Sequence, residues 1–142
     1  MLDTLMKIGA FRVDYFELNE NQDPLAFGFY IRGEVNSHAG YSIEAKLQLY
    51  SGWLMIRSKR LLSHLKAVYV DIDSLDQLER PAYLQLKQDL RKGLFRQLFI
   101  FEESALIGCQ KAEDDLHQLA ETIEGFELFV CHNGECIPFR WD

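Results

Sequence analysis

The dipeptide Asn133-Gly134, placed between two apolar runs, is the feature that most narrows the folds open to this chain. Asn-Gly favours a two-residue type I′ turn, because both central positions of that turn need positive φ. Such a turn pairs His132 with Glu135, Cys131 with Cys136 and Val130 with Ile137. One face of the predicted hairpin then collects Phe126, Leu128, Val130, Ile137, Phe139 and Trp141. A slip of one residue would destroy this sorting, so the sequence predicts a C-terminal hairpin of fixed register.

Apolar and polar residues alternate in three segments of the first half, residues 11–15, 25–32 and 41–50. Period two is typical of half-buried strands. The intervening segments, 19–24 and 36–40, are rich in turn-forming residues and too short for a crossover helix. The sequence therefore predicts an N-terminal, three-stranded antiparallel meander.

Helical spacing predicts a helix from Pro81 to Lys92 that stops at Gly93, and another over residues 111–124 that stops at Gly125. Residues 67–73 are predicted to form a strand. Two segments are ambiguous: residues 53–66, for which we expect a helix in the second half only, and residues 94–101, which suit a buried strand or a continued helix. A short helix at 2–8 and a helical turn from Ser74 complete the prediction.

The chain has 142 residues, 48% of them hydrophobic, and contains no repeat, linker or low-complexity tract. We therefore expect a single domain over residues 1–142. The predicted fold class is α+β: a twisted, mainly antiparallel sheet, made of the meander and the C-terminal hairpin, packed against two or three helices.

The composition excludes several classes of function. A net charge of −7 argues against binding to nucleic acid or to an anionic membrane. There is no apolar run of about 18 residues and no signal-peptide pattern. Three cysteines, an odd number, suit a reducing compartment. We expect a cytoplasmic protein.

Charge is unevenly distributed along the chain. Residues 57–96 carry 9 basic and 5 acidic groups, whereas residues 97–142 carry 2 and 10. The basic side chains are either solvated surface groups or a surface that binds phosphates or an acidic partner. The residues of this candidate surface are Arg57, Lys59, Arg60, Lys87, Arg91, Lys92 and Arg96.

Asp71 and Asp73 stand at i and i+2 near the end of a predicted strand, so their side chains share a face. Paired carboxylates of this kind can hold a magnesium ion with water and phosphate oxygens. Acidic residues just before a helix also serve as caps, and both interpretations remain open.

Cys131 and Cys136 should face each other across the hairpin at a distance that a disulfide can span. They are either a thiol redox switch or two free thiols that fill a half-buried face. Cys131 and His132 are adjacent in a strand and point to opposite faces, which argues against a zinc site. No cofactor is expected.

No catalytic motif or phosphate-binding loop occurs in the sequence. We therefore expect a non-enzymatic binding or regulatory module that acts through one protein partner, of toxin-neutralising, chaperone-like or adaptor type. Whether the chain is an enzyme remains open, and a homodimer is compatible with the sequence. The first alternative is a small metal-dependent enzyme that acts on a phosphate-containing substrate, and the second is a thiol redox switch.

Overall fold

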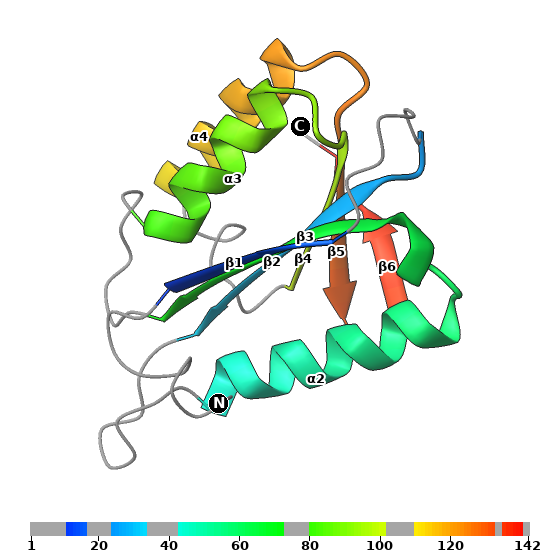
Figure 1. Ribbon diagram of the computed structural model, residues 1–142. Coiled ribbons are helices and arrows are strands. Elements are labelled where there is room, and N and C mark those ends of the chain that lie inside the picture. The colour runs from blue at the N-terminus through cyan, green and yellow to red at the C-terminus, as the bar shows by residue number, and fades with distance from the viewer. Residues whose placement is uncertain are drawn as a thin grey trace.

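A computed structural model describes residues 11–16, 24–33, 43–72, 80–101, 110–132 and 135–140 of the chain. They form a single small α+β domain in which one mixed sheet has helices on both faces (Figure 1). The strands are β1 (Phe11–Tyr15), β2 (Phe27–Gly33), β3 (Leu65–Ile72), β4 (Gln97–Phe101), β5 (Glu127–His132) and β6 (Glu135–Pro138). The helices are α2 (Ile43–Ser58), α3 (Pro81–Arg91) and α4 (Gln110–Thr122), with a short 3-10 turn, η1, at Leu62–His64.

The strand order is β1-β3-β2-β4-β5-β6. The four central strands, β3, β2, β4 and β5, are parallel, and among the described strands only β1 and β6, at the edges, run antiparallel to their neighbours. The prediction of a mainly antiparallel sheet was therefore wrong. The predicted meander is also absent from the described residues, because β1 and β2 both pair with β3 and not with each other.

The wrong prediction of sheet topology originates in helix α2. It occupies residues 43–50 of the segment predicted to be a strand (41–50) and continues into the ambiguous segment 53–66 as far as Ser58. The second half of the ambiguous segment, residues 60–66, was expected to be helical but contains the end of a turn, η1 and the start of β3. The inward side chains follow helical spacing: Ala45, Gln48, Gly52, Met55 and Ile56 are buried. A helix between β2 and β3 is the connection that parallel strands need.

The sheet separates two hydrophobic cores. On one face Tyr30, Tyr69 and Leu98 pack with α3 and α4, and on the other Phe27, Phe29 and Phe99 pack with α2 (Figure 1). Strand β2 is buried along its whole length. Burial on both faces is typical of parallel sheets.

Several predictions about secondary structure within the described residues are confirmed. Strand β3 covers most of the predicted 67–73 segment, and residues 97–101 of the ambiguous 94–101 segment form strand β4. Helices α3 and α4 occupy the predicted segments, and Gly93 and Gly125 have positive φ, 79° and 78°. The β5–β6 register pairs Cys131 with Cys136, as the Asn-Gly turn predicted.

The predicted helix at 2–8, the helical turn from Ser74 and the turn residues Asn133 and Gly134 lie outside the described residues. In the part of the chain that the structure describes, no helix has the length and apolar character needed to span a membrane.

Candidate functional site

Helix α2 is apolar on its outer face as well as on its inner face. Four exposed side chains at helical spacing form a stripe that points away from the sheet, and we call it the α2 stripe. Its residues are Ile43, Leu47, Tyr50 and Leu54, with exposed fractions of 46, 62, 63 and 47%. Helices that are apolar all round are normally buried, so this stripe is a surface without a covering layer among the described residues.

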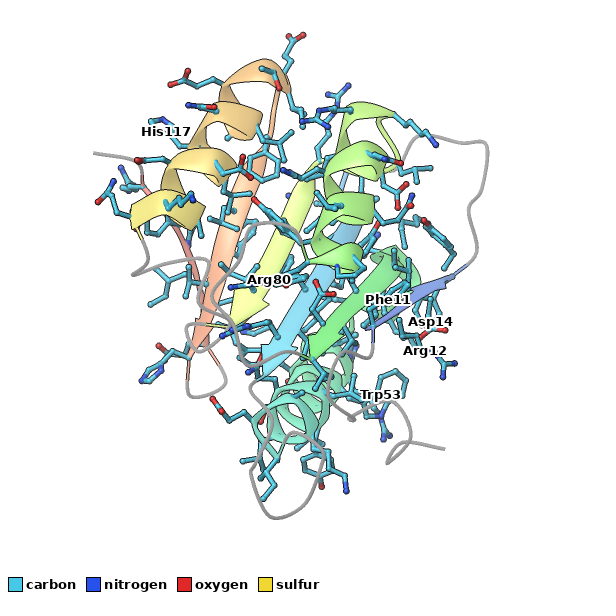
Figure 2. The ribbon with its side chains drawn as sticks, turned by 90° about the vertical axis from the view of Figure 1, so that its left-hand side faces the viewer. Phe11, Arg12, Asp14, Trp53, Arg80 and His117 are labelled. Atoms are coloured by element: carbon cyan, nitrogen blue, oxygen red, sulfur yellow. The ribbon has the colours of Figure 1, made fainter. Side chains whose placement is uncertain are left out.

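A pocket of about 130 Å³ opens beside the α2 stripe, between α2 and the sheet. Trp53 borders both features: it is 43% exposed, and it projects from α2 toward the β1 side of the sheet (Figure 2). Among the described lining residues only Asp14 is charged, and its carboxylate is held by Arg12 at 2.7 Å. The described lining consists of Asp14, Phe16, Phe29, Ile31, Leu49, Trp53, Ile56, Leu65 and Val68.

Basic side chains surround the carboxyl end of the α2 stripe. Arg57, Lys59 and Arg60 are all exposed there, at the last turn of α2 and in the turn that follows. Glu44 is the one acidic residue of α2. The stripe therefore has a basic border, although the whole chain carries a net charge of −7.

The other four residues of the predicted basic surface lie elsewhere. Lys87 and Arg91 are on α3, and Lys92 and Arg96 follow it, on the opposite face of the sheet from α2 (Figure 1). Lys87 forms an ion pair of 3.1 Å with Asp115 and lies 5.0 Å from the centroid of the Tyr83 ring. The structure thus divides the predicted basic residues between the two faces of the molecule.

A second site candidate is the edge of the sheet where the parallel strands end. From β2 the chain continues to β3, the neighbour of β2 on one side. From β3 it returns past β2 to β4, the neighbour of β2 on the other side, so the strand order reverses at β2. Ligands of open α/β sheets bind at such a reversal, outside the carboxyl ends of the strands. Among the described residues at this edge, the charged side chains of Arg32, Asp71 and Arg80 are buried, with exposed fractions of 3, 1 and 2%.

Asp71, one of the two predicted metal ligands, caps α3. Its Oδ1 accepts a hydrogen bond of 2.9 Å from the N–H of Ala82, and its Oδ2 accepts one of 3.0 Å from the N–H of Tyr83. The Tyr30 hydroxyl donates to Oδ2 at 2.9 Å. This arrangement satisfies the free amides of the first helical turn, so the capping interpretation accounts for an aspartate at this position. Asp73 lies outside the described residues.

Arg80 precedes α3 and lies beside its first turn (Figure 2). The pKa of Tyr30 is raised, first by burial and then by the charge of Asp71, while the charge of Arg80 opposes the rise. The Arg80 guanidinium is therefore close to the Tyr30 hydroxyl. With two cations and one anion, this cluster has a net positive charge among the described residues, which suits an anionic ligand.

The thiols of Cys131 and Cys136 meet as predicted, with 2.9 Å between their sulfur atoms. Cys131 is 2% exposed and Cys136 is partly exposed. A hydrogen bond from Cys131 lowers the pKa of Cys136, with a further lowering from Lys59, and burial opposes both effects. The same hydrogen bond and burial raise the pKa of Cys131.

Within the described segments, no group of three or more His, Cys, Asp or Glu side chains is placed to hold a metal ion. His117, on α4, is 3.2 Å from Glu121 and points away from both candidate sites (Figure 2). The sequence did not single out the α2 stripe or the buried pair Arg32 and Arg80. The spacing 43, 47, 50, 54 would have revealed the stripe once a helix was assumed, whereas the arginines depend on strand order.

Comparison of the chain with known proteins found no matching protein-family model, no matching curated protein and no matching solved structure.

Proposed function

We propose that this protein is a non-enzymatic binding module that holds an apolar segment of an acidic protein partner along the α2 stripe. The observation that carries this proposal is the row of four exposed apolar side chains on α2, facing away from the sheet. Contiguous apolar surfaces with a polar border are typical of interaction sites. Amphipathic segments of partners dock on such surfaces through side chains three and four residues apart.

The border of the stripe supports an acidic partner. Arg57, Lys59 and Arg60 stand at one end of it and would attract carboxylates during the approach. A second copy of this chain fits less well, because a two-fold interface brings a surface against itself and places basic groups near basic groups. The pocket beside Trp53 offers an anchor position for one apolar side chain of the partner.

The test is capture of the partner from native cell extract with the tagged protein and with a double variant, L47S/L54S, at low and high salt. We expect the parent protein to retain one stoichiometric partner at low salt and to lose it at high salt. The double variant should lose it at every salt concentration. R57E/R60E should weaken capture at low salt only, because screened charges contribute little at high salt.

Leu84 provides a matched control. It is 40% exposed and lies on α3, on the other face of the sheet. L84S should capture the partner as the parent does. An extract that yields no partner, or a partner lost equally with L84S, would contradict the proposal.

A phosphate-containing ligand at the carboxyl edge of the parallel strands is the second candidate function, and it would favour an enzyme. The supporting observation is the buried pair Arg32 and Arg80, which brings positive charge to the reversal in strand order. Because Asp71 occupies the amides of α3, the arginines would provide most of the attraction.

Thermal unfolding with inorganic phosphate or tripolyphosphate, compared with sodium chloride at equal ionic strength, tests this candidate. A ligand that binds only the folded chain raises the melting temperature. Addition of Mg²⁺ to each sample tests the metal requirement of the first alternative. Equal melting temperatures in all samples would remove this candidate and leave the binding module unaffected.

A further inference from the structure

The thiol pair on the C-terminal hairpin lies in the geometry that a disulfide needs. Phe139 donates a backbone hydrogen bond of 2.8 Å to the Leu128 carbonyl, so these two residues form a hydrogen-bonded pair. Hydrogen-bonded and non-hydrogen-bonded pairs alternate along an antiparallel ladder. Cys131 and Cys136 are three steps away and therefore form a non-hydrogen-bonded pair. At such pairs the Cα atoms are about 4.5 Å apart, within the range that disulfides span.

The two thiols differ in accessibility. Cys131 is 2% exposed and belongs to the core between the sheet and α2, whereas Cys136 packs at the border of that core and is partly exposed. A small oxidant in solution therefore meets Cys136 first. The charge of Lys59, from the turn after α2, acts on both sulfur atoms and favours a thiolate there.

We propose that Cys131 and Cys136 are a modification site that forms a reversible intramolecular disulfide by exchange with a low-molecular-weight disulfide, with Cys136 as the attacking and Cys131 as the resolving thiol. This proposal is independent of the binding function of the α2 stripe.

The exchange has two steps. The Cys136 thiol loses its proton to solvent, and the thiolate attacks one sulfur of the small disulfide. A mixed disulfide forms, and the small thiolate that leaves takes up a proton. The Cys131 thiol then loses its proton to solvent, attacks the Cys136 sulfur and releases the second small thiolate, which takes up a proton. In total, two protein S–H bonds and one S–S bond of the oxidant are replaced by one protein S–S bond and two small thiols.

The bond would attach β6 to β5 covalently. Strand β6 is four residues long and pairs with β5 alone among the described strands, so the bond would add a covalent link to this pairing. Oxidation therefore secures an edge strand, and reduction releases it.

The test uses the full chain with glutathione disulfide, followed by thiol counting and peptide mass spectrometry. The reduced chain has three cysteines, and oxidation of the pair should leave one free thiol. A C109S variant, which removes the remaining cysteine, should fall from two thiols to none, and the linked peptide should contain Cys131 and Cys136.

Two single variants in the C109S chain test the order of attack. C131S should accumulate a stable mixed disulfide on Cys136, whereas C136S should keep Cys131 as a free thiol while the chain remains folded, as circular dichroism would verify. Equal modification of both variants would overturn the assigned roles. Two unreacted thiols in the C109S chain, or a bond to Cys109 in the parent chain, would overturn the site.

Lys59 gives a test that leaves both cysteines in place. Because Lys59 is exposed, K59Q should fold normally, form the same disulfide and form it more slowly. K92Q changes an exposed lysine beyond the end of α3 and should react at the parental rate. Equal rates for parent and K59Q would contradict the role given to Lys59.

Discussion

The side chain of Gln48 on α2 forms hydrogen bonds with both backbone groups of Arg32 on β2, as a neighbouring strand would. Its amide oxygen accepts from the Arg32 N–H at 3.2 Å, and its amide nitrogen donates to the Arg32 carbonyl at 2.8 Å. The last described pair between β2 and β4 is Tyr30 with Ile100, two residues earlier. The side chain of Gln48 therefore continues the hydrogen bonding of β2 at the reversal in strand order and attaches α2 to the carboxyl edge.

The first prediction concerns this pair of hydrogen bonds. Q48L keeps an apolar stem of similar size but leaves the buried N–H and C=O of Arg32 without the partners they have now. An unsatisfied buried polar group costs about 1–3 kcal/mol, so we expect Q48L to lower the free energy of unfolding by at least that amount. Urea unfolding measures the change. Gln110 is exposed at the start of α4, and Q110L, its matched control, should stay within about 0.5 kcal/mol of the parent.

Much of the sheet could be predicted from the sequence, but its pairing could not. Residues 11–15, 27–32 and the hairpin were recognised because they alternate or carry an Asn-Gly turn. Residues 43–50 alternate too, yet they belong to helix α2, whose apolar residues cover both the inner and the outer face. When both faces of a helix carry apolar residues, the spacing of apolar residues in the sequence no longer distinguishes a helix from a strand. Once residues 41–50 were predicted to be a strand, no helix was left to connect parallel strands in the first half of the chain, and the predicted sheet became antiparallel.

The second prediction concerns Gly52, which lies against Phe29. A Cβ atom at position 52 would stand 2.6 Å from two ring atoms of Phe29. Alanine normally stabilises a helix interior relative to glycine by roughly 0.5–1 kcal/mol. Here overpacking, which costs about 1–3 kcal/mol, should exceed that gain, so G52A should lower the melting temperature. S51A changes the exposed neighbour on the same helix and should not destabilise the protein. An increase in stability with G52A would show that α2 can move away from Phe29 at no cost.

The third prediction is a loss of stability at alkaline pH. Tyr15 and Tyr69 both donate to Oδ2 of Asp89, each at 2.6 Å, and thereby join β1 and β3 to α3. Burial, followed by the hydrogen bond to Asp89, raises the pKa of Tyr15 from 10.0 to about 12. Burial also raises the pKa of Tyr69.

Between pH 10.0 and about pH 12, the ordinary and the raised pKa of Tyr15, the unfolded chain releases the Tyr15 proton while the folded chain keeps it. The contribution of this tyrosine is therefore complete below pH 10 and is lost as pH rises toward 12. Urea unfolding at a series of pH values should show stability decreasing across that window. Y15F removes one titrating group and should reduce the slope, and a slope identical to that of the parent would contradict the assignment to Tyr15.

The candidate sites were predictable only where a local pattern determines them. The meeting of Cys131 with Cys136 follows from a two-residue turn and needs no other part of the fold. The pairing of Asp71 with α3 has a local basis too, because strand end and helix start are close in sequence. The proximity of Arg80 to Tyr30 depends instead on the order of strands in the sheet, which no local pattern in this chain encodes.

The fourth prediction separates the two interpretations of Asp71. As the cap of α3, its carboxylate accepts hydrogen bonds from Ala82, Tyr83 and Tyr30. In D71N one carboxylate oxygen becomes an NH₂ group that faces a donor, so we expect a loss of about 1–3 kcal/mol in the presence of EDTA. D114N, at an exposed position on α4, should have little effect. If Asp71 instead acts mainly as a metal ligand, D71N should match the parent in EDTA, and Mg²⁺ should raise the melting temperature of the parent alone.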